Sequence, residues 1–247
     1  MARGYFLVGT DHNIGTTMLT GAIAGALREQ GNNTGVFNPI AMSANTFEAG
    51  NRKICESVKY LKELSTSQDD FNLINPYSFE MQNIPLIAAR FGSDTCISIE
   101  KLDDIYFRLS LLRECIFIDG GAGLLSPVTR DETMVDLLLT FNAELVIVTK
   151  PSRMMVPDVL QLAYFAMQTG IPILGYIINH WYEEAATIVD FEQIEIIKNH
   201  VGLSNLGMLP CFEDVDFTNP ENYDRIKSEV KKRIDLTAFR EKPNDWL

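Results

Sequence analysis

Short runs rich in valine, isoleucine and leucine alternate along this chain with longer stretches whose apolar residues recur at helical spacing. The apolar runs predict strands over residues 5–9, 35–40, 115–119, 145–149, 173–179 and 206–210. The amphipathic stretches predict helices over residues 17–30, 51–64, 100–112, 156–169, 188–201 and 221–239, with a polar loop over 65–75. Continuously apolar strands separated by helices are typical of a parallel sheet covered on both faces. The 247 residues contain no linker, repeat or low-complexity segment, so we expect residues 1–247 to form a single doubly wound α/β domain.

The charge balance excludes several classes of partner. The chain carries 21 lysine and arginine residues against 33 aspartate and glutamate residues, which gives a net charge of −12. Nucleic-acid binding needs a surplus of cations to neutralise phosphates, and an acidic surface is repelled by anionic lipid. No stretch reaches the roughly 18 apolar residues that a membrane-spanning helix needs. We therefore expect neither a nucleic-acid partner nor a membrane partner.

The N-terminal segment and the cysteines indicate the compartment. The first apolar run is short, lacks a small-residue cleavage site and passes directly into a glycine turn, which is typical of a strand and not of a signal peptide. The four cysteines are widely spaced and only three histidines accompany them, so we expect reduced thiols and no metal site built from Cys and His. These features favour a cytoplasmic protein.

A glycine-containing loop, G-T-D-H-N-I-G-T-T over residues 9–17, joins the first predicted strand to the first predicted helix. Its glycines have the spacing of the phosphate-binding pattern G-x-x-x-x-G-K-[ST], in which backbone N–H groups surround an anion at a helix N-terminus. Thr17 occupies the hydroxyl position that contacts Mg²⁺, but Thr16 occupies the lysine position and supplies no charge. The loop is therefore either a phosphate-binding loop without its cation or a tight turn that binds nothing.

Five further motifs follow this loop in order. They are F-N-P-I-A-M-S (37–43), N-P-Y-S-F (75–79), I-D-G-G-A-G-L-L-S-P (118–127), G-Y-I-I-N-H (175–180) and G-M-L-P-C (207–211). Each is weak alone, but in this order and spacing the set resembles the dethiobiotin synthetase family over nearly the whole chain. The resemblance implies a P-loop NTPase-like fold and a homodimer. It also implies a small-molecule substrate, because that family uses ATP and Mg²⁺ to close the ureido ring of dethiobiotin from 7,8-diaminononanoate and CO₂.

The resemblance also implies roles for individual positions of this chain. Thr16 and Asn38 stand at catalytic positions, and Thr17 and Asp119 stand at the positions that hold Mg²⁺. The substrate-binding positions are Thr10, Asn38, Ser43 and Gly121. The nucleotide-binding positions, among which Asn179 would recognise adenine, are Asn13, Ile14, Gly15, Thr16, Thr17, Met18, Asn179 and Pro210.

Several positions depart from the family pattern. Both lysines that face the phosphates and the carbamate are replaced, one by Thr16 and the other by Asn38. The segment 55–58 lacks the usual metal-binding aspartate, and residues 153–158 lack the usual L-G-x-I-N-H-like helix start. Removal of one oxyanion donor often costs about 2.7–4 kcal/mol in a transition state, so the loss of two cations should cost more. The cations considered as replacements are Arg52, Lys53 and Arg153.

Three functions remain open at this point. The ordered motifs favour an ATP-dependent ligase of the dethiobiotin synthetase type. The lost lysines and aspartate favour a non-catalytic paralogue that acts as a nucleotide-binding regulator or a dimeric scaffold. A partition-type ATPase is a weaker third hypothesis, because the additional lysine expected early in its phosphate loop is missing here.

Overall fold

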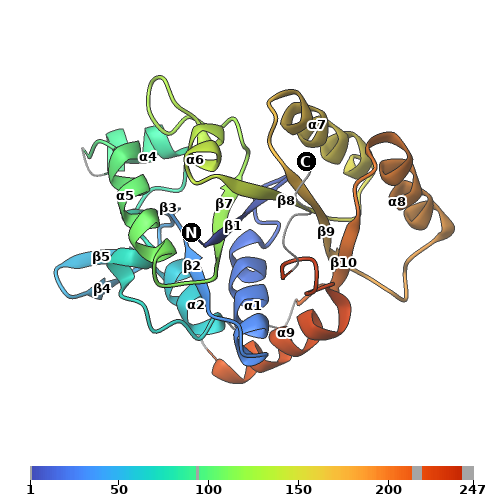
Figure 1. Ribbon diagram of the computed structural model, residues 1–247, viewed down its shortest axis with the longest axis horizontal. Coiled ribbons are helices and arrows are strands. Elements are labelled where there is room, and N and C mark those ends of the chain that lie inside the picture. The colour runs from blue at the N-terminus through green and yellow to red at the C-terminus, as the bar shows by residue number, and fades with distance from the viewer. Residues whose placement is uncertain (1, 93–94, 213–218, 241–247) are drawn as a thin grey trace.

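A six-stranded sheet forms the centre of the computed structural model, which describes residues 2–92, 95–212 and 219–240 (Figure 1). The strand order is β10-β9-β8-β1-β7-β2, and every neighbouring pair is parallel. The strands are β1 (Arg3–Gly9), β2 (Thr34–Phe37), β7 (Cys115–Ala122), β8 (Ala143–Thr149), β9 (Ile173–Trp181) and β10 (Asn205–Pro210). The predicted parallel sheet is confirmed.

Helices lie on both faces of this sheet. They are α1 (Thr16–Glu29), α2 (Glu56–Leu64), α3 (Phe71–Ile74), α4 (Pro85–Gly92), α5 (Ile99–Ser110), α6 (Met134–Thr140), α7 (Met155–Gln168), α8 (Ile188–Val201) and α9 (Pro220–Arg233). Figure 1 shows α7 beside α8, and α1 beside α9. None of the helices in the described part of the chain is long and apolar enough to cross a membrane.

Alternate side chains of β1 enter two different apolar cores, which explains why the strand is continuously apolar. Phe6 and Val8 pack into a core with α4 to α8, whereas Tyr5 and Leu7 pack into a second core with α1, α2 and α9. All four side chains are fully buried. A strand buried on both faces cannot show the polar alternation of a half-exposed strand.

The predicted strand over residues 35–40 is wrong at its end. Strand β2 stops at Phe37, and the next backbone N–H, that of Asn38, donates to Ile74 O at 2.8 Å instead of to a sheet neighbour. Pro39 has no N–H to donate and so interrupts the ladder. A separate strand, β3 (Ile40–Met42), then pairs in parallel with β6 (Tyr77–Phe79).

The predicted helix over residues 51–64 is wrong at its start. Residues 52–55 form strand β5 (Arg52–Cys55), which pairs antiparallel with β4 (Thr46–Ala49), and α2 begins only at Glu56. The pairing of residues 52–55 depends on residues of the other strand, so the helical spacing within 51–64 could not reveal this strand.

Two further predictions are corrected near helix ends. The expected loop over 65–75 contains the single turn of α3, whose N-cap Asp70 accepts a hydrogen bond from Asn72 N at 2.7 Å. The last predicted helix, over 221–239, ends at Arg233, because Ile234 leaves the helix and forms an antiparallel bridge with Gly207 of β10.

The connections place the glycine loop at the centre of the sheet. Strand β1 lies between β7 and β8, and the chain leaves its carboxyl end through residues 10–15 into α1. The sheet extends through β7 and β2 on one side and through β8, β9 and β10 on the other. In open α/β sheets, the crevice at such a reversal of strand order is the usual ligand site.

Candidate functional site

The glycine loop is held in place by the two strands beyond β1. Thr10 N donates to Val148 O at 2.9 Å, and Asn179 Nδ2 donates to Ile14 O at 2.8 Å. Gly15 caps α1 with a φ of 89°, in the left-handed region, and a Cβ there would lie 2.5 Å from Asn179 Nδ2. Glycine is therefore needed at position 15 both for its backbone conformation and for space.

A buried carboxylate stands beside the start of α1. Asp119, 5% exposed at the carboxyl part of β7, accepts from Thr17 Oγ1 at 2.5 Å and from Asn38 Nδ2 at 3.0 Å. Its other oxygen accepts from Gly121 N at 3.2 Å. We call Thr16, Thr17, Asn38 and Asp119 the Asp119 cluster. Every donor in it is neutral.

The protonation of Asp119 follows from these surroundings. Burial raises the pKa of this carboxyl, and the hydrogen bonds from Thr17, Thr16, Gly121 and Asn38 oppose that rise only in part. A cation beside the carboxylate would lower the pKa further. The two residues at lysine positions, Thr16 and Asn38, supply hydrogen bonds in place of that charge.

A cavity of about 780 Å³ opens in front of the Asp119 cluster. The predicted site residues that line it are Asn13, Ile14, Gly15, Thr16, Thr17, Met18, Asn38, Ser43, Asp119 and Gly121. Three predicted site residues, Thr10, Asn179 and Pro210, do not line it. Thr10 instead donates through its hydroxyl to Thr149 Oγ1 at 3.3 Å, beside the loop.

The cavity lining carries negative but no permanent positive charge. Its carboxylates are Asp11 and Asp119, and within the described residues no lysine or arginine lines it. The remaining lining includes Ile40, Tyr60 and Met134. A triphosphate in this cavity would rely on backbone N–H groups and on any metal ion it brings.

The three cations considered as replacements lie elsewhere. Arg52 donates to Asn72 Oδ1 at 2.6 Å and to backbone carbonyl groups of residues 75 and 76, and Lys53 pairs with Glu80 at 3.0 Å. Arg153 is exposed before α7, and it is not part of the cavity lining. None of the three compensates Asp119.

The sequence analysis missed Lys150, which lies next to the loop. Its Nζ is 2.9 Å from Asp11 Oδ2, and Asp11 Oδ1 accepts from His12 N at 2.7 Å. Lys150 directly follows the strand predicted over 145–149, so its position at the carboxyl edge of the sheet could have been predicted. Its ion pair with a loop residue could not have been predicted, because that contact joins segments that are distant in the sequence.

Two buried amide oxygens lack a hydrogen-bond donor in the described part of the chain. The Oδ1 atoms of Asn38 and Asn179 have no hydrogen-bond partner among the described residues, and the two side chains belong to residues that are 5% and 1% exposed. Both Nδ2 groups are already used, on Asp119 and on Ile14 O. A buried acceptor without a donor is costly, so a ligand N–H that reached either oxygen would be favoured.

The donor set fits a magnesium ion that arrives with a nucleotide better than a free ion. Thr17 Oγ1 and Asp119 supply a hydroxyl and one carboxylate, and Mg²⁺ commonly takes one or two carboxylates together with phosphate oxygens and water. Among the described residues no group of three or more His, Cys, Asp or Glu side chains could hold a metal ion by itself.

Comparisons with known proteins identify relatives of this chain. A family model described as an AAA domain matches residues 3–219. An ATP-dependent dethiobiotin synthetase BioD from Bacillus cereus (strain G9842) is 30% identical over 227 residues, which cover 92% of this chain and 90% of that protein. The protein of the same name from Nitrosopumilus maritimus is 28% identical over 237 residues, with 96% and 99% covered.

Solved structures with low sequence identity share the fold. The MinD cell division protein of Aquifex aeolicus superposes with a TM-score of 0.58 at 15% identity, with 98% of this chain and 99% of that chain covered. A ParA family ATPase from Chlorobium tepidum has a TM-score of 0.53 at 18% identity, with 94% and 91% covered. At such identities the likeness shows the fold alone.

Proposed function

The chain belongs to the dethiobiotin synthetase family, and on that premise we propose that it is a nucleotide-binding member that does not close the ureido ring efficiently. One observation carries the proposal. Thr16 and Asn38, which stand where the family has lysines, both lie against Asp119, and no lysine or arginine among the described residues lines the cavity. Such a protein would act as a regulator that responds to nucleotide.

The features that support nucleotide binding are local. Backbone N–H groups of residues 13–17 and the N-terminus of α1 would hold the phosphates, and Thr17 and Asp119 would hold Mg²⁺. The unpartnered Oδ1 of Asn179 would accept from the exocyclic amine of adenine, and Pro210 would lie along the base. A bound Mg²⁺ would supply the positive charge that the chain itself does not place beside Asp119.

The features that oppose ring closure are electrostatic. Closure brings a carbamate and a γ-phosphate together, and the transition state gathers further negative charge between them. Each donor lost from such a site costs about 2.7–4 kcal/mol, and here two cationic donors are absent. Asp119, when ionised, adds a like charge that repels both anions.

Calorimetry and an activity assay on one sample test the proposal. We expect ATP with Mg²⁺ to bind and 7,8-diaminononanoate with bicarbonate to give no efficient turnover. Efficient ring closure by the wild-type chain would overturn the non-catalytic part, and absence of both binding and turnover would overturn the nucleotide-binding part. Gly15→Ala is the control for specific binding, because its Cβ would meet Asn179 Nδ2 and displace the loop.

An active ligase is the second candidate, and the Lys150–Asp11 pair is the observation that favours it. If Lys150 left Asp11 for a bound phosphate, it would restore one cation to the loop. Turnover by the wild type that Lys150→Met abolishes would support this candidate. Both proposals include a homodimer, and sedimentation velocity measures the oligomeric state.

A further inference from the structure

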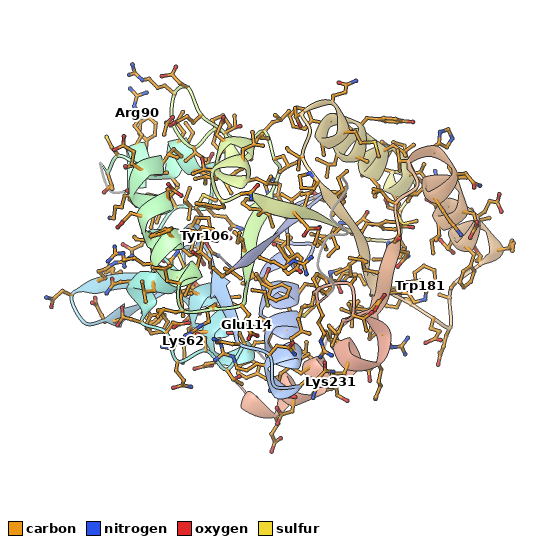
Figure 2. All side chains as sticks on the ribbon, in the orientation of Figure 1. Lys62, Arg90, Tyr106, Glu114, Trp181 and Lys231 are labelled. Atoms are coloured by element: carbon orange, nitrogen blue, oxygen red, sulfur yellow. The ribbon has the colours of Figure 1, made fainter. Side chains whose placement is uncertain are left out.

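A histidine and a cysteine lie in contact at the carboxyl end of the sheet, outside the Asp119 cluster. His180 Nδ1 is 3.1 Å from Cys211 Sγ, and the two residues come from neighbouring parallel segments, β9 and the residue after β10. Figure 2 labels Trp181, the neighbour of His180, beside β10. Both His180 and Cys211 are half-buried, so neither side chain is fully enclosed by the fold.

The backbone at His180 has an unusual conformation for a strand residue. Its φ is 56°, in the left-handed region, and the β9–β10 register shifts between Met208 and Pro210. Non-glycine residues adopt this region uncommonly. The contact between the imidazole and the sulfur therefore lies where the ends of β9 and β10 are irregular.

The other three cysteines have different surroundings. Cys55 and Cys115 are buried, and burial raises the pKa of both thiols, that of Cys115 to about 12. Cys96 is exposed on the segment between α4 and α5. Cys211 thus combines access to solvent with an imidazole nitrogen at hydrogen-bond distance from its sulfur.

We propose that Cys211 and His180 form a reactive thiol–imidazole pair that is a site of modification by peroxides. The thiol proton moves from Sγ to Nδ1 of His180, and the resulting thiolate attacks one oxygen of the peroxide. The O–O bond breaks and an S–O bond forms. The sulfur is oxidised by two electrons to a sulfenic acid, while the other peroxide oxygen is reduced and leaves with the imidazolium proton, as water when the oxidant is hydrogen peroxide.

The position of the pair couples it to the proposed ligand. His180 directly follows Asn179, and Cys211 directly follows Pro210, the two residues proposed to contact the base. This coupling rests on the proposed function, whereas the reactivity of the pair does not. A bound nucleotide would shield Cys211, and an oxidised Cys211 would hinder the nucleotide.

Alkylation rates of individual cysteines test the pair on the full chain. The protein without nucleotide is treated with iodoacetamide at pH 7, and each cysteine is followed by peptide mass spectrometry. An unassisted thiol is only a few per cent thiolate at this pH, so we expect Cys211 to react on the order of tenfold faster than Cys96. Cys55 and Cys115 remain unmodified if the fold is intact.

The matched variant is His180→Asn, because asparagine tolerates a positive φ but cannot take the proton. We expect it to lower the Cys211 rate to that of Cys96, while the Cys96 rate stays unchanged. With hydrogen peroxide and dimedone, the wild type should give a sulfenic acid adduct at Cys211 and the variant should give much less.

Equal alkylation rates at Cys211 and Cys96 in the wild type would overturn the proposal of a reactive pair. An unchanged Cys211 alkylation rate in the variant would also overturn it. A separate experiment measures whether ATP with Mg²⁺ slows the alkylation of Cys211. Fast alkylation without protection would keep the pair and count against the proposed nucleotide site.

Discussion

A buried ionisable side chain lies near each end of helix α1, and the two differ in their hydrogen-bond partners. At the N-terminal end, the carboxylate of Asp119 contacts neutral donors only, from Thr17, Asn38 and Gly121. At the C-terminal end, Lys227, which is 4% exposed, pairs with Glu29 at 2.6 Å. Figure 2 shows the nearby Lys231, which also pairs with Glu29, at this end of the molecule.

The pKa directions express the same contrast. Burial alone would lower the pKa of Lys227, but its contacts with Glu29 and Asp224 outweigh burial and raise it. For Asp119 burial prevails over the hydrogen bonds, and the pKa is raised toward the neutral form. The C-terminal end is therefore compensated by the chain itself, as expected of a structural contact. The carboxylate that faces the cavity has only neutral hydrogen-bond donors among the described residues.

The largest effect is expected from removing the buried cation at the C-terminal end of α1. Lys227→Met should lower the free energy of unfolding by about 2–3 kcal/mol, because Glu29 loses its buried partner. The loss stays below the 3–5 kcal/mol of fully buried pairs, since Glu29 is partly exposed and keeps Lys231. Urea denaturation measures the change. Lys232→Met, at an exposed lysine of the same helix, is the control and should change stability by less than about 0.5 kcal/mol.

The next effect is expected from adding charge at the uncompensated end. The double change Thr16→Lys, Asn38→Lys should raise the affinity for ATP with Mg²⁺ at least about tenfold, or about 1.4 kcal/mol, because charge-assisted hydrogen bonds to phosphate replace neutral ones. Calorimetry measures it. The control Gln68→Lys, Asn199→Lys adds the same charge at exposed positions outside the cavity lining and should leave the affinity nearly unchanged. Unchanged affinity in the first variant would mean that charge is not what the site lacks.

The smallest effect is expected from removing the buried charge itself. Because the pKa of Asp119 is raised in the folded state, stability is lost as pH rises through that pKa. Asp119→Asn removes this loss and should stabilise the chain by roughly 1 kcal/mol at pH 7. The difference should vanish as pH falls to about 4, the ordinary pKa of aspartate. Denaturation at several pH values measures it, and a variant less stable than the wild type at pH 7 would show that the hydrogen bonds to the carboxylate matter more than its burial.

Much of the central sheet was predictable because its signals are local. The runs over 5–9, 115–119, 145–149, 173–179 and 206–210 all lie in strands. In the inner strands the cause is burial on both faces, which requires apolar residues throughout. The hairpin of β4 and β5 was missed because neither strand is continuously apolar and its pairing is decided across the turn.

The loop residues that line the cavity could be predicted from the sequence, but their contacts could not. The loop spacing led to residues 13–18, and all of them line the cavity. Spacing could not reveal that Asn179 lies buried beneath Ile14, or that Lys150 lies against Asp11. These contacts join residues that are 165 and 139 positions apart in the chain.

The sequence by itself determined the fold class, the phosphate-type loop and the absence of lysine at positions 16 and 38, because periodicity and spacing are properties of neighbouring residues. Only the tertiary structure decided what those two positions contact. The amide of Asn38 meets Asp119 across 81 positions of the chain, from β2's end to β7. That contact exists because parallel strands bring their carboxyl ends to one edge of the sheet, and burial there gives a single carboxylate its raised pKa.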